Sequence, residues 1–221
     1  MTLDRSSRAA VGLLWLACIA VDAATFLLSR SLWAALTLAV PLLALCIWQT
    51  AFHMVPRRKR TGGELDVTSV ADGKVVAVKK IPEREFLCRD SVMVSVYMDF
   101  WDLHANFWPV SGEVEYMMYH AGRHFLAFKP KASEENEHAC MSVRTPGGDS
   151  VFFKLLAGGF ARRISCYGAK GSRAVAGEQC GIIKFGSRVD IYLPADAEIL
   201  VSPGDRVLAC TTVIARLQPR G

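Results

Sequence analysis

Residues 181–194 read Gly181-Ile182-Ile183-Lys184-Phe185-Gly186-Ser187-Arg188-Val189-Asp190-Ile191-Tyr192-Leu193-Pro194, and they place a Gly-Ser pair between two runs that favour β-strands. A pair of this kind usually forms a turn or a bulge. Gly186 has no side chain, so its carbonyl is open to attack and its backbone reaches conformations that other residues avoid. Ser187 is a nucleophile beside that carbonyl. The remainder of the chain decides whether the pair is a turn or a site of chemistry.

Around this segment, short runs of β-branched and aromatic residues are separated by Gly, Pro or charged residues, a spacing that predicts a compact β-barrel or β-sandwich. Three turn phrases, at Asp72-Gly73, Ser111-Gly112 and Pro203-Gly204, each precede an apolar run and resemble the hairpin units of a lipoyl-like hybrid fold. The predicted strands are Val75–Val78, Val92–Met98, Val110–Met118, Phe125–Phe128, Cys140–Arg144, Val151–Leu156, Ala161–Tyr167, Gly181–Phe185, Arg188–Leu193 and Arg206–Leu217.

The first 60 residues carry most of the apolar excess. Two runs, 9–28 and 32–52, are each long enough to cross ~30 Å of hydrocarbon as a helix, and the short connection between them predicts a hairpin. Arg5 and Arg8 precede the first run and four basic residues at 57–60 follow the second, which places both ends in the cytoplasm at the inner membrane. The expected domains are a membrane hairpin at 1–60 and a cytoplasmic, mainly β domain at 61–221. The alternative is a buried helical hairpin of a soluble protein.

Composition and charge agree with a membrane-associated chain. Hydrophobic residues make up 52% of the 221 residues, and the net charge of +5 suits an anionic membrane surface. Basic and aromatic residues are not interleaved, so no nucleic-acid partner is expected. Seven cysteines without a CxxC or other metal-ligand spacing indicate reduced thiols in a cytoplasmic compartment.

Some histidine and aromatic residues invite functional interpretations that the pattern does not favour. His120 and His124 have the spacing of metal ligands on a helix, but the surrounding pattern is that of a strand and offers no third ligand, so no metal is expected. Trp101, Phe107 and Trp108 are typical of a core, although beside a membrane they could enter the headgroup layer.

Four phrases stand in a specific order. Ala71-Asp72-Gly73-Lys74-Val75-Val76 comes first, followed by Asp102-Leu103-His104-Ala105-Asn106-Phe107-Trp108-Pro109-Val110-Ser111-Gly112, Lys131-Ala132-Ser133-Glu134-Glu135-Asn136-Glu137, and Phe185-Gly186-Ser187-Arg188. Together they resemble the phosphatidylserine decarboxylase family in its short bacterial and archaeal form, which includes archaetidylserine decarboxylase-like members. The resemblance covers roughly residues 50–217, and each phrase alone would be weak.

The resemblance implies a proenzyme that cuts itself between Gly186 and Ser187, leaving a pyruvoyl group at the start of the small chain as its covalent cofactor. That ketone would form a Schiff base with the serine headgroup of phosphatidylserine and accept the electrons left when CO2 departs, giving phosphatidylethanolamine. The implied partners are the lipid substrate, the membrane and the associated large and small chains, with a homo-oligomer left open. The chemistry involves the headgroup alone, so the type of lipid tail stays open.

The resemblance also implies the residues that activate Ser187. Asp72 matches the acidic member of the family's triad and His104 matches a site histidine. Longer members carry a second histidine where this chain has Phe107. Either His104 does both jobs or another histidine, such as His120, reaches the site; a purely structural His104 packed at a strand end is the third possibility. The loop at 131–137 is expected either to be merely solvated or to touch the site.

Two other functional classes compete with this interpretation. A lipoyl or biotinyl carrier would share the hairpin architecture, but it needs a modifiable lysine at an exposed hairpin tip, and Lys184 stands inside a predicted strand. A non-catalytic, membrane-anchored binding module is the other alternative. It would be indicated by a chain that never splits.

Overall fold

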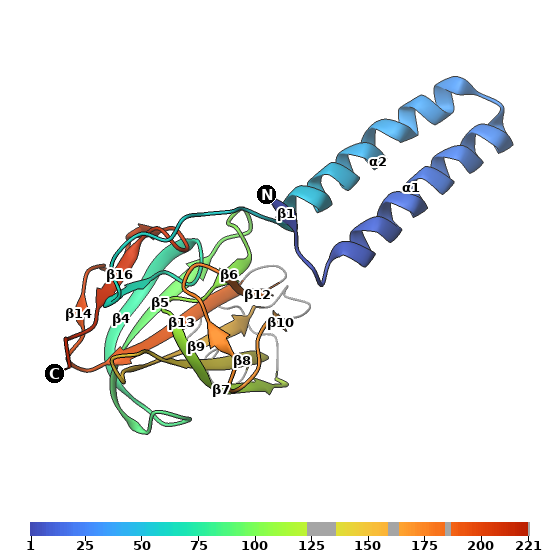
Figure 1. The fold of residues 1–221 in the computed structure, drawn as a ribbon. Coiled ribbons are helices and arrows are strands. Elements are labelled where there is room, and N and C mark those ends of the chain that lie inside the picture. Colours follow the sequence, from blue (N-terminus) through green and yellow to red (C-terminus); the bar gives the residue numbers. More distant parts are fainter. Residues whose placement is uncertain (123–135, 159–163, 184–186, 221) are drawn as a thin grey trace. The chain divides into compact units, whose positions relative to one another are not determined.

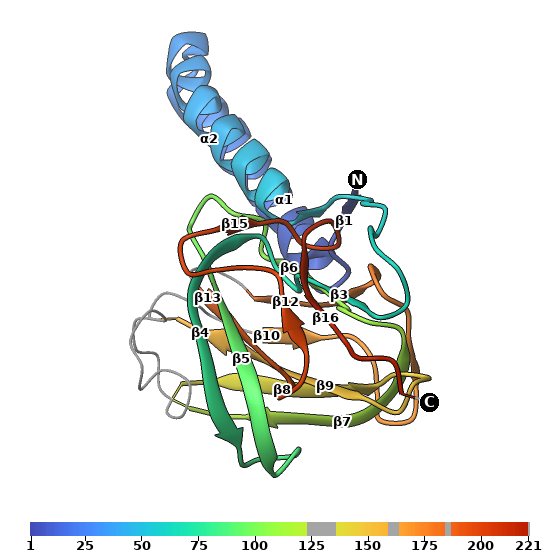
Figure 2. The ribbon, with the colours of Figure 1, turned by 90° about the vertical axis from the view of Figure 1, so that its left-hand side faces the viewer.

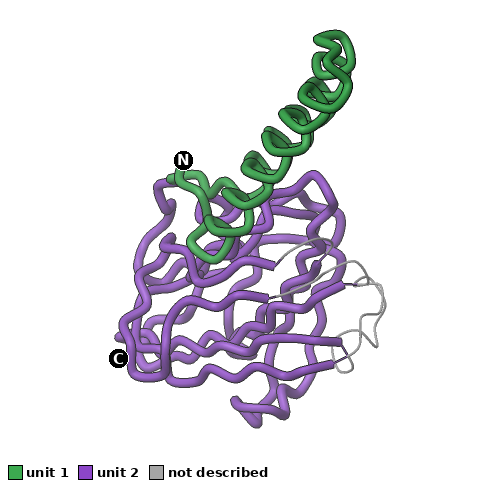
Figure 3. Tube along the Cα trace, turned by 90° about the vertical axis from the view of Figure 1, so that its right-hand side faces the viewer, with its two compact units in different colours: residues 1–57 green, residues 58–221 purple. Residues whose placement is uncertain are grey.

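A computed structural model describes residues 1–122, 136–158, 164–183 and 187–220. The chain forms two compact units, Met1–Arg57 and Arg58–Gly221, which Figure 3 colours separately. Gly186, Lys184, His124 and the predicted strand at 125–128 lie outside the described residues.

The first unit is a pair of helices, α1 (Arg8–Ser29) and α2 (Leu32–Phe52), closed by a short antiparallel pairing of β1 (Thr2–Leu3) with β2 (Met54–Val55) (Figure 1). Ser31 caps α2 because its side chain accepts a hydrogen bond from the amide of Ala34, and Trp15 Nε1 donates to Thr50 Oγ1 at 3.0 Å across the two helices. Both helices are long and apolar enough to cross a membrane, by length and composition. The predicted pair of apolar helices is confirmed.

The second unit is built from antiparallel strands in three sheets (Figures 1 and 2). An eight-stranded sheet has the order β11-β7-β8-β9-β13-β5-β4-β15, and two three-stranded sheets have the orders β10-β12-β6 and β14-β16-β3. The bounds are β3 Asp66–Thr68, β4 Gly73–Glu83, β5 Arg89–Met98, β6 Ala105–Phe107, β7 Gly112–His120, β8 His138–Arg144, β9 Ser150–Ala157, β10 Ile164–Cys166, β11 Arg173–Ala174, β12 Gln179–Ile183, β13 Ser187–Pro194, β14 Glu198–Ile199, β15 Arg206–Val207 and β16 Val213–Arg216. The mainly β class is confirmed.

Strand β13 runs through the middle of the large sheet, paired with β5 on one side and β9 on the other. Because side chains alternate along a strand, Val189, Ile191 and Leu193 enter the main hydrophobic core, whereas Arg188 and Tyr192 face the opposite side of the sheet. Val189, Ile191 and Leu193 are completely buried. The segment quoted first therefore contributes the most central strand of the fold.

The strands differ from the prediction in several places, of which two bear on the site. The run at 206–217 does not form one strand, since β15 and β16 are separated by a turn in which Cys210 has a positive φ of 67°. In addition, β6 occupies the residues just before Pro109, where no strand was expected. Three residues give too little alternation to be recognised in a sequence, and tertiary pairing with β12 creates this strand.

Candidate functional site

Ser187 is the first residue of β13, at the point where the chain leaves the small sheet containing β12 and enters the large sheet. It lies opposite Met98 of β5 and Ala157 of β9. The side chain is completely buried, and its hydroxyl donates a hydrogen bond to the sulfur of Met98 at 3.0 Å. A thioether is a weak acceptor and does not take up a proton at neutral pH, so Met98 can hold this hydroxyl but cannot activate it.

His104 follows the end of β5 and is also completely buried. Its Nδ1 lies 2.7 Å from the carbonyl oxygen of Asp102, and its own carbonyl oxygen accepts a hydrogen bond from the amide of Ile183 at 3.1 Å. A carbonyl oxygen can only accept, so Nδ1 carries a proton, and in the neutral form of the ring the lone pair lies on Nε2. The histidine is thus in the tautomer of a base and is tied to the last residue described before the Gly-Ser pair.

Asp72 immediately precedes β4 and is held by two donors. The guanidinium of Arg58 forms an ion pair with both carboxylate oxygens, and the amide of Ala209 donates to Oδ1 at 2.8 Å. This hydrogen bonding raises the pKa of Arg58. Gly73 is required next to Asp72, because a Cβ there would lie 2.2 Å from the carbonyl oxygen of Tyr97. The carboxylate is therefore fixed near the same end of β5 that meets Ser187.

Asn106 lies beside the same sulfur as Ser187 and was not singled out from the sequence. It lies in β6, completely buried, with Nδ2 3.8 Å from the sulfur of Met98, the same atom that holds Ser187. Its Oδ1 is buried without a hydrogen-bond partner among the residues that the structure describes. Turning the amide over would place Oδ1 against the thioether of Met98. Because a thioether donates no hydrogen bond, the oxygen would still be unsatisfied. A buried, unsatisfied amide costs about 1–3 kcal/mol, so this atom has capacity for a ligand.

The remaining predicted site residues divide into two groups. Phe107 and Trp108 are buried, at 3% and 4% exposure, as expected of core residues, whereas the core expectation for Trp101 is wrong because it is 80% exposed. Asn136 and Glu137, the described end of the loop at 131–137, are buried against Ala157, the register partner of Ser187: Asn136 Nδ2 donates to its carbonyl at 2.7 Å. The end of that loop thus lies next to the site strand.

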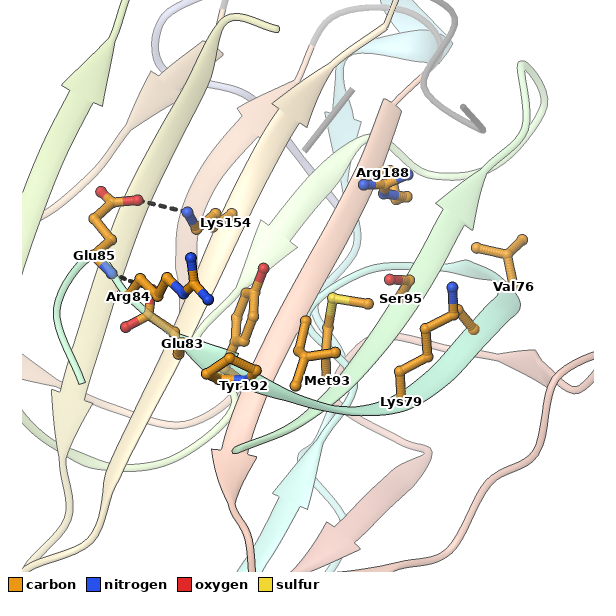
Figure 4. A pocket seen from close by; sticks show the side chains of 13 residues that line it. Val76, Lys79, Glu83, Arg84, Glu85, Met93, Ser95, Lys154, Arg188 and Tyr192 are labelled. Atoms are coloured by element: carbon orange, nitrogen blue, oxygen red, sulfur yellow. Dashed lines mark hydrogen bonds and ion pairs between the residues drawn. The ribbon is translucent and has the colours of Figure 1, made fainter. Parts of the chain in front are cut away.

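The other face of the same sheet carries a pocket of about 840 Å³ (Figure 4). Its lining includes Arg188, whose Nη2 is 2.9 Å from Asp190 Oδ2, and Ser95, which donates to Asp190 Oδ1 at 2.6 Å. Tyr192 also lines it, and burial raises the pKa of this phenol well above its usual range. Since Arg188 and Ser187 point to opposite faces, this pocket is separated from the serine by the sheet.

Comparison with known proteins connects this arrangement to one family. A model of the phosphatidylserine decarboxylase family matches residues 46–215, a span that includes the buried serine, histidine and aspartate. The chain belongs to the phosphatidylserine decarboxylase family. Members of this family with a curated name include a phosphatidylserine decarboxylase proenzyme of Aromatoleum aromaticum, 42% identical over 81% of this chain and 83% of that protein.

Two further family members share most of their length with this chain. Both are named phosphatidylserine decarboxylase proenzyme. The protein of Amoebophilus asiaticus is 38% identical over 86% of this chain and 84% of its own length. The protein of Saccharopolyspora erythraea is 41% identical over 88% of this chain and 82% of its own length. The similarity therefore extends through both the β-rich unit and part of the helical pair.

Proposed function

We propose that this chain is a phosphatidylserine decarboxylase proenzyme that cuts itself between Gly186 and Ser187 and then decarboxylates phosphatidylserine to phosphatidylethanolamine. The observation that carries the proposal is the position of Ser187: completely buried, at the first residue of the central strand, directly after the crossing from one sheet to another. A conventional turn serine would be exposed at the surface.

Self-cleavage would begin with attack of the Ser187 hydroxyl on the carbonyl carbon of Gly186. A new C–O bond forms as the peptide C–N bond breaks, which converts the amide into an ester and frees the serine amine. Loss of the serine Cα proton then expels the Gly186 carboxylate and leaves a dehydroalanine, whose hydrolysis releases ammonia and gives the pyruvoyl group. The attack needs a base because a hydroxyl is a poor nucleophile at neutral pH. The elimination needs a base to remove the Cα proton.

His104 is the base that the geometry favours. The carbonyl of Asp102 fixes Nδ1 as a protonated nitrogen, so the neutral form of the ring carries its lone pair on Nε2 and can accept a proton there. The hydrogen bond from Ile183 ties its backbone to the residues just before Gly186. Asp72 takes the acidic role, and for this it must share its carboxylate with Arg58. His120 lies in β7 next to Glu85, on the face with Lys154, so it is the weaker candidate for the second histidine.

The residues around Ser187 fit a pyruvoyl group. The atoms of the group come from Ser187 itself, whose buried position excludes bulk water. A pyruvoyl group supplies a ketone that acts as an electron sink when a carboxylate leaves as CO2. Asn106 Oδ1 would accept a hydrogen bond from the amine of the serine headgroup and so orient it. Cutting the chain at 186–187 removes a covalent constraint on this buried end, which gives the headgroup a way in.

The membrane and the substrate belong to the same proposal. The two apolar helices would hold the enzyme at the inner membrane with its β-rich unit on the cytoplasmic side, where the exposed Arg57 and Lys59 meet anionic headgroups. Trp101 is exposed on the loop that leads to His104, and its indole suits the headgroup layer. After cleavage, β13 keeps the small chain bound to the large one.

Intact-mass analysis of the purified protein tests this function. The expected result is two chains, 1–186 and 187–221, with the second lacking an amino-terminal amine and able to react with a carbonyl reagent. Borohydride in the presence of phosphatidylserine should trap an adduct on the small chain. An uncut chain that shows no decarboxylation would favour the binding-module alternative.

A further inference from the structure

The face of the large sheet opposite Ser187 carries a second group of chemically reactive side chains. His120 of β7 and His138 of β8 are register partners, and Cys140 lies two residues along β8, so it points to the same face. Glu85 comes from the connection between β4 and β5, and its Oε1 lies 2.9 Å from His120 Nε2. Residues distant in the sequence thus converge on one point.

We propose that Glu85, His120, His138 and Cys140 bind one Zn²⁺ ion. One potential donor atom from each residue lies within 4.8 Å of the other three. Zinc bound tetrahedrally by nitrogen, oxygen and sulfur at about 2.0–2.3 Å would bring donors to roughly 3.3–3.8 Å from one another. The donors would therefore have to approach one another by up to about 1 Å when zinc binds. Imidazole and thiolate donors together favour zinc over magnesium or calcium, which prefer oxygen.

The histidines are arranged as metal ligands commonly are. His138 Nδ1 lies 2.6 Å from the carbonyl oxygen of Asn136, so Nδ1 holds the proton and Nε2 keeps its lone pair for a metal. A backbone carbonyl in this place is a frequent outer partner of zinc-bound histidine, because it fixes both tautomer and ring orientation. The rings of His120 and His138 stack with centroids 4.6 Å apart and planes 20° apart, so the two imidazoles lie side by side at the cluster.

Lys154 places a positive charge next to the proposed zinc site, so a bound cation must be compatible with it. Its ammonium lies 2.5 Å from Glu85 Oε2, whereas Oε1 of the same carboxylate faces His120 (Figure 4 shows the Glu85–Lys154 pair). The two oxygens therefore have different tasks: Oε1 can bind zinc while Oε2 keeps the lysine as an outer partner. With a thiolate and a carboxylate as ligands, the negative charges balance the ion, and Lys154 adds one positive charge at the pocket side.

The exposure of the four side chains shows how a zinc ion could reach the cluster from solvent. Cys140 is completely buried and His138 is 8% exposed, but the side chain of His120 is 39% exposed and gives the ion a route from solvent. Bound zinc would join the β4–β5 connection to β7 and β8. The ion would therefore stabilise the fold at a site on the opposite face from Ser187.

The test measures zinc on the full-length, detergent-purified protein. We expect one zinc per chain by elemental mass spectrometry, and Co²⁺ in its place should produce the near-ultraviolet charge-transfer band of a cobalt–thiolate bond. Cys140→Ser should lose that band, and His138→Gln should weaken the affinity by more than the ~10–100-fold that loss of an outer partner costs. Cys166→Ser is the matched control, because Cys166 lies in β10 outside the cluster, and it should keep both the zinc and the band.

Folding is monitored separately, so a failed variant does not obscure the result. Chelation should lower the unfolding temperature of the wild-type protein and of Cys166→Ser but leave folded Cys140→Ser unchanged. A wild-type protein that retains no zinc after equilibration with micromolar Zn²⁺, or a Cys140→Ser protein with the wild-type cobalt spectrum, would overturn the proposal. The cluster would then be a hydrogen-bonded network around the Glu85–Lys154 pair.

Discussion

The hydroxyl of Ser187 donates its hydrogen bond to the thioether of Met98, 3.0 Å away. The nucleophile of the proposed reaction is therefore buried and oriented while its described partner is unable to deprotonate it. Such an arrangement would let the chain fold completely before the proposed cut. Activation requires the hydroxyl to turn from the sulfur toward a base.

Ser187→Ala should stay a single, folded, membrane-bound chain without decarboxylase activity. Only a weak hydrogen bond is lost, so the free energy of unfolding should fall by no more than about 1 kcal/mol. Electrophoresis and intact mass report the cut, and lipid turnover reports activity. Ser142→Ala, a buried serine of β8, is the control and should still be cut. Decarboxylation by Ser187→Ala would exclude the pyruvoyl mechanism.

Asp72→Asn should slow self-cleavage and lower stability by about 1–3 kcal/mol, because the charge that holds Arg58 is lost. The appearance of the small chain over time and chemical denaturation measure the two effects. Asp66→Asn is a matched control. Asp66 also forms an ion pair with an arginine, Arg216, at 2.8 Å, but this pair lies in the small sheet of β3 and β16 and not beside Ser187. Its cleavage rate should be unchanged, and equal slowing in both variants would reduce Asp72 to a structural role.

His104→Gln should abolish decarboxylation and block or greatly slow the cut, because glutamine keeps the hydrogen bonding but supplies no base. Phe107→His places a histidine where longer family members have one and should speed maturation if His104 compensates for its absence. Pulse-chase appearance of the small chain measures both. Normal processing and turnover by His104→Gln would remove this histidine from the site.

Asn106→Ala should reduce decarboxylation with little loss of precursor stability, since the amide removed makes only a weak bond to the sulfur of Met98 and has an unsatisfied buried oxygen. The control is Asn136→Ala, in which a completely buried amide loses its 2.7 Å bond to Ala157, and which should be destabilised by about 1–3 kcal/mol. Comparing kcat and KM with unfolding curves separates the two cases. A strongly destabilised Asn106→Ala with unchanged kinetics would assign Asn106 to structure alone.

Deleting residues 1–54 should leave a unit that still cuts itself, because Arg58–Gly221 forms a compact unit of its own. Turnover of phosphatidylserine in bilayers should fall much further than turnover of a short-chain soluble analogue, since the anchor supplies effective concentration at the membrane. Parallel assays on vesicles and on the analogue make the comparison. An equal fall on both substrates would speak against anchoring.

The sequence predicted the features that have strong local signals. Two apolar runs and alternating strands made the helical pair and the mainly β class predictable, and the ordered phrases around Asp72, His104 and Ser187 made the family predictable. The assigned roles of these three residues stay predictions. Asn106 gave no signal because its importance comes from an unmet hydrogen bond, which only the folded environment creates.

The Glu85, His120, His138 and Cys140 group was invisible for a related reason. In the sequence His120 is notable only for its spacing to His124, whereas its described neighbours in the cluster come from a facing strand and a distant connection. Strand register, which pairs His120 with His138, depends on long-range pairing and cannot be read from a local pattern.

The placement of β13 between β5 and β9 has a further consequence once the chain is cut at its first residue. The precursor unfolds and refolds as one molecule, with an equilibrium that is independent of concentration. The mature enzyme would have a central strand donated by a separate peptide, so unfolding becomes a dissociation and refolding a bimolecular encounter. The mature enzyme would owe its stability to a slow unfolding rate. Thermal unfolding that is reversible in the precursor would be irreversible in the mature form.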